Sequence, residues 1–153
     1  MLIDAWDHRI LDIITAGEQF GIESGLNPEQ GKARDKVFQD LWLAFNDPNV
    51  GLFIEYLDPE HNHIGGFAIA NTDDMFMQNK VGVINKFYVM PEGRGKGVSR
   101  ILIQQVVDWL DEQGAVHQYA TSTGGIGQNK AFENLLAKVG FVPEGLILKR
   151  GIK

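Results

Sequence analysis

The sequence predicts one mixed α/β domain, with a central and mostly antiparallel sheet, helices on both faces and one parallel pair of strands. The apolar residues follow helical and strand periods in the order two helices, three strands, helix, strand, helix and terminal strand. Residues 81–123 have the pattern of a strand, a crossover helix and a second strand, and such a connection joins parallel strands. The 153 residues fit a single domain over 1–153, long enough to bury one core.

Two helices are predicted before the first strand. Residues 7–20 place their apolar side chains roughly on one side of a helix. A connection that contains Gly, Asn and Pro covers 21–31, within which Pro28 suits the first turn of a second helix. That helix runs to about Phe45, because the run Asn46-Asp47-Pro48-Asn49 ends it.

Three strands come next. The β-rich runs 50–57 and 63–70 are separated by a turn at 58–62, so they are expected to form a hairpin. A polar loop at 71–80 leads to the third strand, 81–89, which is rich in Val, Ile, Phe and Tyr.

The C-terminal half begins with a strongly apolar helix over 98–113, which Gly114 ends. A fourth strand follows at 116–123, and glycines then form a loop at 124–127.

A last helix is predicted over 129–139, with Gly140 as its cap. One or two short strands are expected within 141–152, broken at Pro143-Glu144-Gly145.

The composition argues against several classes of protein. The net charge is -6, whereas a general nucleic-acid binder carries a basic face. No apolar stretch approaches the roughly 20 residues of a membrane helix. The start, Met1-Leu2-Ile3-Asp4, lacks the basic and apolar regions of a secretory signal. With no cysteine as well, we expect a cytoplasmic protein that binds neither nucleic acid nor membrane.

No metal site is expected. His61 and His63 stand two apart in the predicted hairpin turn, without a cluster of further ligands, and are interpreted as solvated turn residues. The absence of cysteine removes thiolate ligands and a cysteine nucleophile.

A glycine-rich turn joins the third strand to the apolar helix. The first N–H groups of a helix have no intrahelical partner, and the helix dipole makes that end positive, so a diphosphate can bind there. Gly95 and Gly97 let the backbone come close to such a group. Three cations oppose one anion in 92–100, a local charge of +2: Arg94, Lys96, Arg100 and Glu92. This reversal within an acidic chain predicts diphosphate binding better than the glycines alone, which also suit a plain tight turn.

This stretch resembles the acetyl-CoA-binding motif of the GNAT superfamily of N-acetyltransferases. That motif is Val-x-Pro, two or three residues, then Arg/Gln-x-x-Gly-x-Gly/Ala. The matching residues are Val89, Pro91, Arg94 and Gly97, while Ser99 stands where Gly or Ala is usual. Residues 129–141, from Asn129 to Gly140-Phe141, are similar to the penultimate helix of the family. The resemblance covers roughly 81–142.

The resemblance implies the GNAT fold, with its parallel strands splayed apart, and acetyl-CoA as the cofactor. The backbone of the third strand would pair with the pantetheine arm, the turn would hold the pyrophosphate, and Asn129 would contact the arm from the other side. The expected coenzyme-binding residues are Phe87, Tyr88, Val89, Arg94, Gly95, Lys96, Gly97, Val98, Ser99, Arg100 and Asn129. The implied partner is an amine-bearing acceptor, a small molecule or a protein amine, and many relatives form homodimers.

The implied activity is direct transfer of an acetyl group from acetyl-CoA to a primary amine in a ternary complex. A backbone N–H at the Val89 end of the strand would hold the developing oxyanion. The tyrosine that protonates the departing thiolate in many members is replaced here by Leu136. Such proton transfer contributes about 10²–10⁴-fold, and water, Tyr88, Tyr119 or Ser122 are the candidate substitutes.

The general base is also open. Glu55, on an earlier strand, is the nearest carboxylate candidate, against a solvated surface glutamate or a base that acts through ordered water. Because Leu136 replaces the usual acid, a catalytically weak or inactive module that binds coenzyme A or another protein is the alternative function. A structural domain without coenzyme binding is the third.

Overall fold

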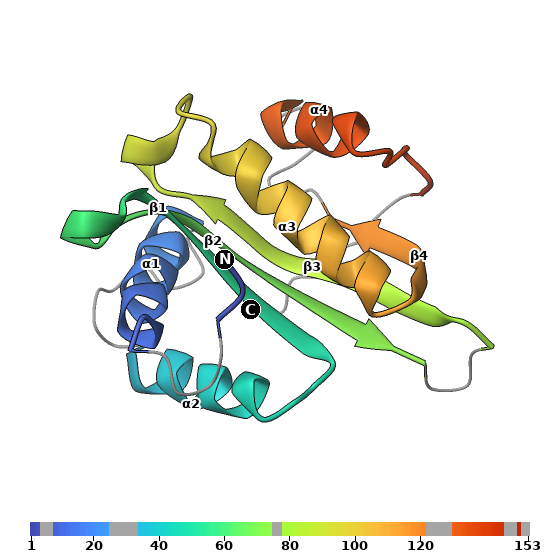
Figure 1. The fold of residues 1–153 in the computed structure, drawn as a ribbon, viewed down its shortest axis with the longest axis horizontal. Helices are drawn as coiled ribbons and strands as arrows, with labels where there is room; N and C mark the ends of the chain where they lie inside the picture. The colour runs from blue at the N-terminus through green and yellow to red at the C-terminus, as the bar shows by residue number, and fades with distance from the viewer. Residues whose placement is uncertain (4–7, 25–33, 75–77, 122–129, 146–149, 151–153) are drawn as a thin grey trace.

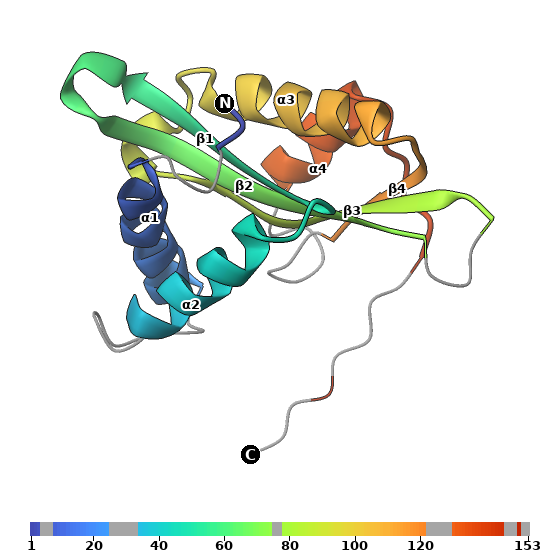
Figure 2. The same ribbon diagram turned by 60° about the horizontal axis from the view of Figure 1, so that its bottom comes forward.

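The computed structural model describes residues 1–3, 8–24, 34–74, 78–121, 130–145 and 150. Within them, one sheet has the strand order β1-β2-β3-β4. Helices α1 and α2 lie on one side of this sheet, and α3 and α4 on the other (Figures 1 and 2). The principal elements are α1 (Ile10–Glu23), α2 (Arg34–Phe45), β1 (Val50–Asp58), β2 (His63–Asp73), β3 (Lys80–Val89), α3 (Val98–Glu112), β4 (Ala115–Ala120) and α4 (Lys130–Lys138). The predicted mixed α/β fold is confirmed.

The sheet is antiparallel except at its last pair. β1 pairs with β2 and β2 with β3 in antiparallel fashion, whereas β3 and β4 are parallel. The predicted hairpin is confirmed, and Asn62 completes its turn with a φ of 51°. Asparagine tolerates this left-handed conformation better than most residues do.

Some predicted boundaries are wrong. β2 continues through residues 71–73, which the sequence had placed in a loop, because Thr72 is buried and donates its N–H to the Asn49 carbonyl at 2.8 Å. α1 ends at Glu23, three residues past the predicted end, inside the expected connection. Residues 141–145 contain no strand, and most of the remaining predicted terminal strand region lies outside the described residues.

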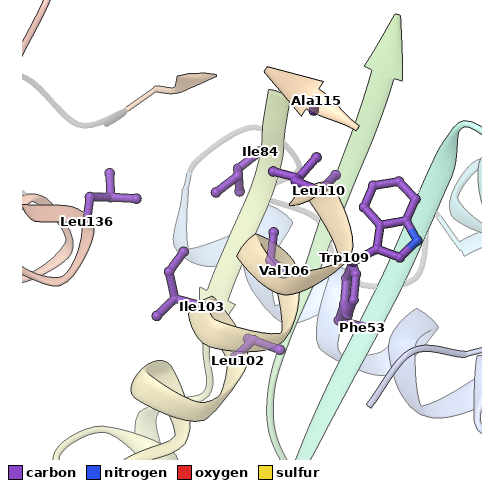
Figure 3. Packing of buried hydrophobic residues seen from close by; sticks show 11 residues of the cluster. Phe53, Ile84, Leu102, Ile103, Val106, Trp109, Leu110, Ala115 and Leu136 are labelled. Atoms are coloured by element: carbon purple, nitrogen blue, oxygen red, sulfur yellow. The ribbon is translucent and has the colours of Figure 1, made fainter. Parts of the chain in front are cut away.

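The sheet separates two apolar clusters. The α3-side cluster joins that helix to inward residues of all four strands and to Leu136 of α4. Figure 3 shows Phe53 beside Trp109, with Leu102 and Val106 on the inner face of α3. The α1-side cluster contains Ile13, Ile14, Leu41, Phe67 and Tyr88, among others. Among the described helices, none has the length and apolarity needed to cross a membrane.

A β-bulge at Asn85 resets the alternation of side chains along β3. Lys86 pairs with Ile69 and Ile84 with Ala70, so Asn85 is an extra residue with no opposite partner in β2. Ile84 and Phe87 consequently both pack on the α3-side cluster although they are three residues apart. Tyr88 then enters the α1-side cluster. The bulge thus decides which side chains face which layer where β3 approaches the glycine turn.

Candidate functional site

The glycine turn opens directly in front of α3. Gly95 and Gly97 have φ angles of 77° and 83°, a region that favours glycine. Gly97 is the N-cap of α3, and no side chain caps the helix. A Cβ placed on either glycine would meet nothing within 4 Å. The chain therefore presents the start of a helix to open space, as a bound anion requires.

The free donors of this helix are its first amides. The first intrahelical bond runs from the Ile101 N–H to the Gly97 carbonyl at 3.2 Å. The N–H groups of residues 97–100 therefore have no intrahelical acceptor. The Lys96 N–H donates instead to the Gly93 carbonyl, 3.2 Å away, so it shapes the turn. Lys96 and Arg100 are exposed and add positive charge near these donors.

Three further glycines hold the turn against the sheet from behind. A Cβ on Gly93 would lie 2.7 Å from the Gly65 carbonyl oxygen, and one on Gly65 would lie 2.8 Å from a methyl of Val98. A Cβ on Gly66 would lie 2.6 Å from the Tyr88 carbonyl oxygen. Because these positions lack side chains, the first residue of α3 packs directly on β2.

The parallel pairing of β3 with β4 ends before this turn is reached. The β3–β4 register ends at Ile84 and Ala120, beside the bulge. The Met90 N–H donates to the Gly65 carbonyl at 2.8 Å. In a trans peptide the Val89 carbonyl must point the other way, away from β2, and the Val89 N–H shares that edge by strand alternation. Among the described residues, the end of β3 therefore has backbone groups on an edge that no strand pairs.

Glu23, Tyr88 and Arg94 form a contact group, which we call the Glu23 cluster. Glu23 accepts a hydrogen bond from the Tyr88 hydroxyl at Oε2, and Arg94 Nη2 donates to its Oε1 at 2.5 Å. Arg94 Nε donates to the Val89 carbonyl at 3.2 Å. The guanidinium carbon lies 5.8 Å from the centre of the Tyr88 ring, within cation–π range. The cluster ties the last residue of α1 to the end of β3.

Burial and hydrogen bonding shift the acid–base properties of this cluster. Burial, and then the bond to Glu23, raise the pKa of Tyr88 well above its usual range. The hydrogen bond from Tyr88, followed by the contact with Arg94, lowers the pKa of Glu23 against the effect of its burial. The phenol is thus held neutral and the carboxylate ionised near neutral pH.

Tyr88 should make the protein less stable in alkali. The pKa of Tyr88 is higher in the folded than in the unfolded state. Its contribution to the free energy of unfolding is therefore complete below the ordinary tyrosine pKa of about 10 and is lost as the pH rises above that value. We expect Tyr88→Phe to flatten the fall in the free energy of unfolding between about pH 9 and 11, measured by urea titration. Tyr119→Phe, at an exposed tyrosine of β4, is the matched control. Equal slopes for Tyr88→Phe and wild type would contradict the assignment.

The other predicted catalytic residues lie in different places. Glu55 is on β1, two strands away from β3, where it accepts a hydrogen bond from Gln105 at 3.0 Å and lies 3.7 Å from the amino group of Met1. Tyr119 is exposed on β4. Leu136 is buried in the α3-side cluster. Ser122 and Asn129 lie outside the described residues.

Two residues of the site were missed from the sequence. Glu23 was placed in a connection, and its contact with Arg94 spans 71 residues, so no local pattern could indicate it. Phe132 of α4 packs against Phe87 with ring centres 5.0 Å apart, on the side of the sheet that carries α3 and α4. This aromatic pair follows from the bulge, since Phe87 would otherwise face α1.

Known proteins provide an independent comparison. The acetyltransferase (GNAT) family matches residues 18–141. No curated protein sequence matches the chain. Among solved structures, an aminoglycoside acetyltransferase from an uncultured soil metagenomic sample, in complex with sisomicin, has a TM-score of 0.76 at 14% identity, covering 100% of this chain and 95% of that one. AAC(6')-Iy, in complex with the bisubstrate analog CoA-S-monomethyl-acetylneamine, has a TM-score of 0.75 at 18% identity, with coverages of 100% and 97%. A transcriptional regulator from Bacillus halodurans C-125 has a TM-score of 0.77 at 13% identity, with coverages of 99% and 99%.

Proposed function

Because this chain belongs to the acetyltransferase (GNAT) family and is therefore an acyltransferase, we propose that it transfers an acetyl group from acetyl-CoA to a primary amine by direct attack in a ternary complex. One observation carries the proposal. The uncapped start of α3, with left-handed Gly95 and Gly97 and open space before them, lies beside the unpaired end of β3. The chain thus offers a diphosphate site and a free strand edge together.

The described residues offer groups for two parts of coenzyme A, its diphosphate and its pantetheine arm. The N–H groups of residues 97–100 would bind the diphosphate, and the exposed Lys96 and Arg100 would add charge. The edge of β3 at Phe87 and Val89 would pair with the amides of the pantetheine arm. Acetyl-CoA supplies the acetyl group as a thioester. Asn129 stays a proposed contact to the arm.

The Val89 N–H is the proposed oxyanion donor. It lies on the unpaired edge of β3, and the neighbouring Met90 N–H is fixed by its bond to Gly65. A donor held in place in this way stabilises the negative charge that develops on the acetyl carbonyl oxygen while the C–N bond forms and the C–S bond breaks.

Proton transfer is assigned to water. Leu136 is buried among apolar side chains and has no ionisable proton to donate. The Tyr88 hydroxyl already donates to Glu23. Glu55 accepts a hydrogen bond from Gln105 and lies beside the Met1 amino group, so this proposal does not use it as the base. Water would take the ammonium proton of the acceptor and protonate the departing sulfur, while Tyr119 and Ser122 stay candidates for the latter step.

We propose a small cationic amine as the acceptor. Two structures that share this fold are described with sisomicin or with an acetylneamine analog, and the net charge of -6 favours a cation by long-range attraction. Protein amines are the other acceptor class.

Coenzyme binding and turnover test the proposal together. At 100 times its dissociation constant, acetyl-CoA should stabilise the fold by about 2.7 kcal/mol, a rise in Tm of roughly 5–10 °C. Thiol release should then be measured with sisomicin, a polyamine and a lysine peptide. Release with an amine is the expected result. Tight binding without turnover on any amine would favour the alternative, a coenzyme-binding module without catalysis. The buried Leu136, in place of the usual tyrosine acid, is the observation that supports this alternative. No change in Tm would refute the coenzyme site.

A further inference from the structure

We propose that Glu23 is a positioning residue for acetyl transfer: through Arg94 it fixes the end of β3 that carries the Val89 N–H. This inference rests on the proposed function and names a residue outside the glycine motif. Glu23 is the last residue of α1, on the opposite side of the sheet from α3. It thus connects α1 to β3 and to the glycine turn at the candidate site.

The two carboxylate oxygens of Glu23 have separate partners. Oε1 accepts from Arg94 Nη2 at 2.5 Å, and Oε2 accepts from the Tyr88 hydroxyl. Tyr88 is 8% exposed, and its ring lies edge-on to Phe20 at 5.6 Å between centroids. Because Tyr88 is held by packing, it gives Glu23 a fixed anchor. Glu23 in turn holds the guanidinium of Arg94 in one orientation.

Arg94 transmits this constraint to the backbone. Its Nε donates to the Val89 carbonyl at 3.2 Å, while the Met90 N–H on the other edge donates to Gly65 at 2.8 Å. The Val89–Met90 peptide is therefore held from both edges. The Val89 N–H belongs to the preceding Tyr88–Val89 peptide, which lies between this held peptide and the Tyr88 side chain that Glu23 binds. Glu23 thus constrains the chain on both sides of that N–H, and misplacing a catalytic group by about 1 Å can cost roughly 100-fold in rate.

The same contacts give Arg94 a different role from the cations that would bind phosphate. Its Nη2 and Nε both serve protein acceptors, and its charge is balanced by Glu23. Arg94 therefore acts as a link between α1 and β3. Lys96 and Arg100 remain as the cations of the turn. Glu23 itself is a poor general base, because an ionised carboxylate paired with Arg94 has little tendency to take a proton.

Glu23→Gln tests this assignment, with Glu112→Gln as the matched control. Both residues end a helix, but Glu112 is exposed at the far end of α3. We expect Glu23→Gln to lower kcat by about tenfold while the Kd of acetyl-CoA, measured by calorimetry, stays within about threefold. Glu112→Gln should match the wild type. The amide ¹H–¹⁵N signal of Val89 should shift in Glu23→Gln and stay in place in the control.

A second variant keeps the test decisive if Glu23→Gln unfolds. Arg94→Lys retains a charge for Glu23 but has no guanidinium Nε for the Val89 carbonyl, so it should show the same loss in kcat. The double variant should lose no more than the worse single variant, because both changes break one chain of contacts.

The possible failures are distinguishable. Wild-type protein that neither binds nor turns over acetyl-CoA would refute the proposed function and this inference with it. Active wild type with an unchanged kcat in Glu23→Gln and Arg94→Lys would refute the role of Glu23 alone. Tighter coenzyme binding in Glu23→Gln would show that Glu23 restrains a phosphate-binding Arg94. That result would also overturn the positioning role of Glu23.

Discussion

Gly97→Val is expected to weaken acetyl-CoA binding by about 100-fold or more, a loss of about 2.7 kcal/mol or more. Gly97 adopts a φ of 83° as the N-cap of α3, in front of open space. A β-branched residue at positive φ forces the backbone to change, which would turn the first amides away from the diphosphate. Its side chain would also project into the region that the coenzyme should fill. Calorimetric titration with acetyl-CoA measures the loss.

Gly114→Val is the matched control for this substitution. Gly114 follows α3 at a φ of 77°, and a Cβ there also meets nothing within 4 Å. Both variants should therefore pay a similar conformational cost in the free energy of unfolding, about 1–2 kcal/mol. Only Gly97→Val should lose coenzyme affinity. If both variants bound acetyl-CoA as tightly as the wild type, the diphosphate would have to lie elsewhere.

Leu102→Ala is expected to cost about 3 kcal/mol in the free energy of unfolding, and roughly 10 °C in Tm. Leu102 is 0% exposed on the first turns of α3, where it packs into the α3-side cluster (Figure 3). Truncation removes buried apolar surface and leaves a cavity beneath the helix that carries the proposed diphosphate site. Urea unfolding of the variant measures the cost.

Leu11→Ala makes the same chemical change at an exposed site. Leu11 of α1 is 57% exposed, so its truncation should change the free energy of unfolding by less than about 0.5 kcal/mol. Saturating acetyl-CoA should recover part of the loss in Leu102→Ala through linkage to the folded state. A Leu102→Ala variant as stable as Leu11→Ala would mean that α3 is not packed as described.

The parts of the fold and site that the sequence predicts are those with local causes. The helix over 98–113 follows from its apolar period and its flanking glycines, and the structure ends it one residue earlier, at Glu112. The glycine turn before this helix is predicted from its glycines, and the structure adds that Gly95 and Gly97 have positive φ. These features depend on neighbours within a few residues, so a single sequence contains their signal.

The unpredicted parts depend on tertiary contacts. The pairing of residues 71–73 needs strand partners that offset the cost of burying Thr72, and the composition of that segment alone suggests a loop. Likewise, the local charge of +2 counted Arg94 as a phosphate-binding cation. The structure balances Arg94 with Glu23, which is distant in sequence, so the free charge of the turn is smaller than the count implies.

The extra residue at Asn85 also has a consequence for reading related sequences. Up to Ile84, the even-numbered positions of β3 face the α3-side cluster. From Lys86 onward, the odd-numbered positions face that cluster and the even-numbered ones face the α1-side cluster. An alignment that places the gap elsewhere in this strand would exchange the inferred neighbours of every position between that gap and Asn85. Substitution patterns at Phe87 and Tyr88 are therefore interpretable only when Asn85 is treated as an insertion, with the two halves of the strand compared separately.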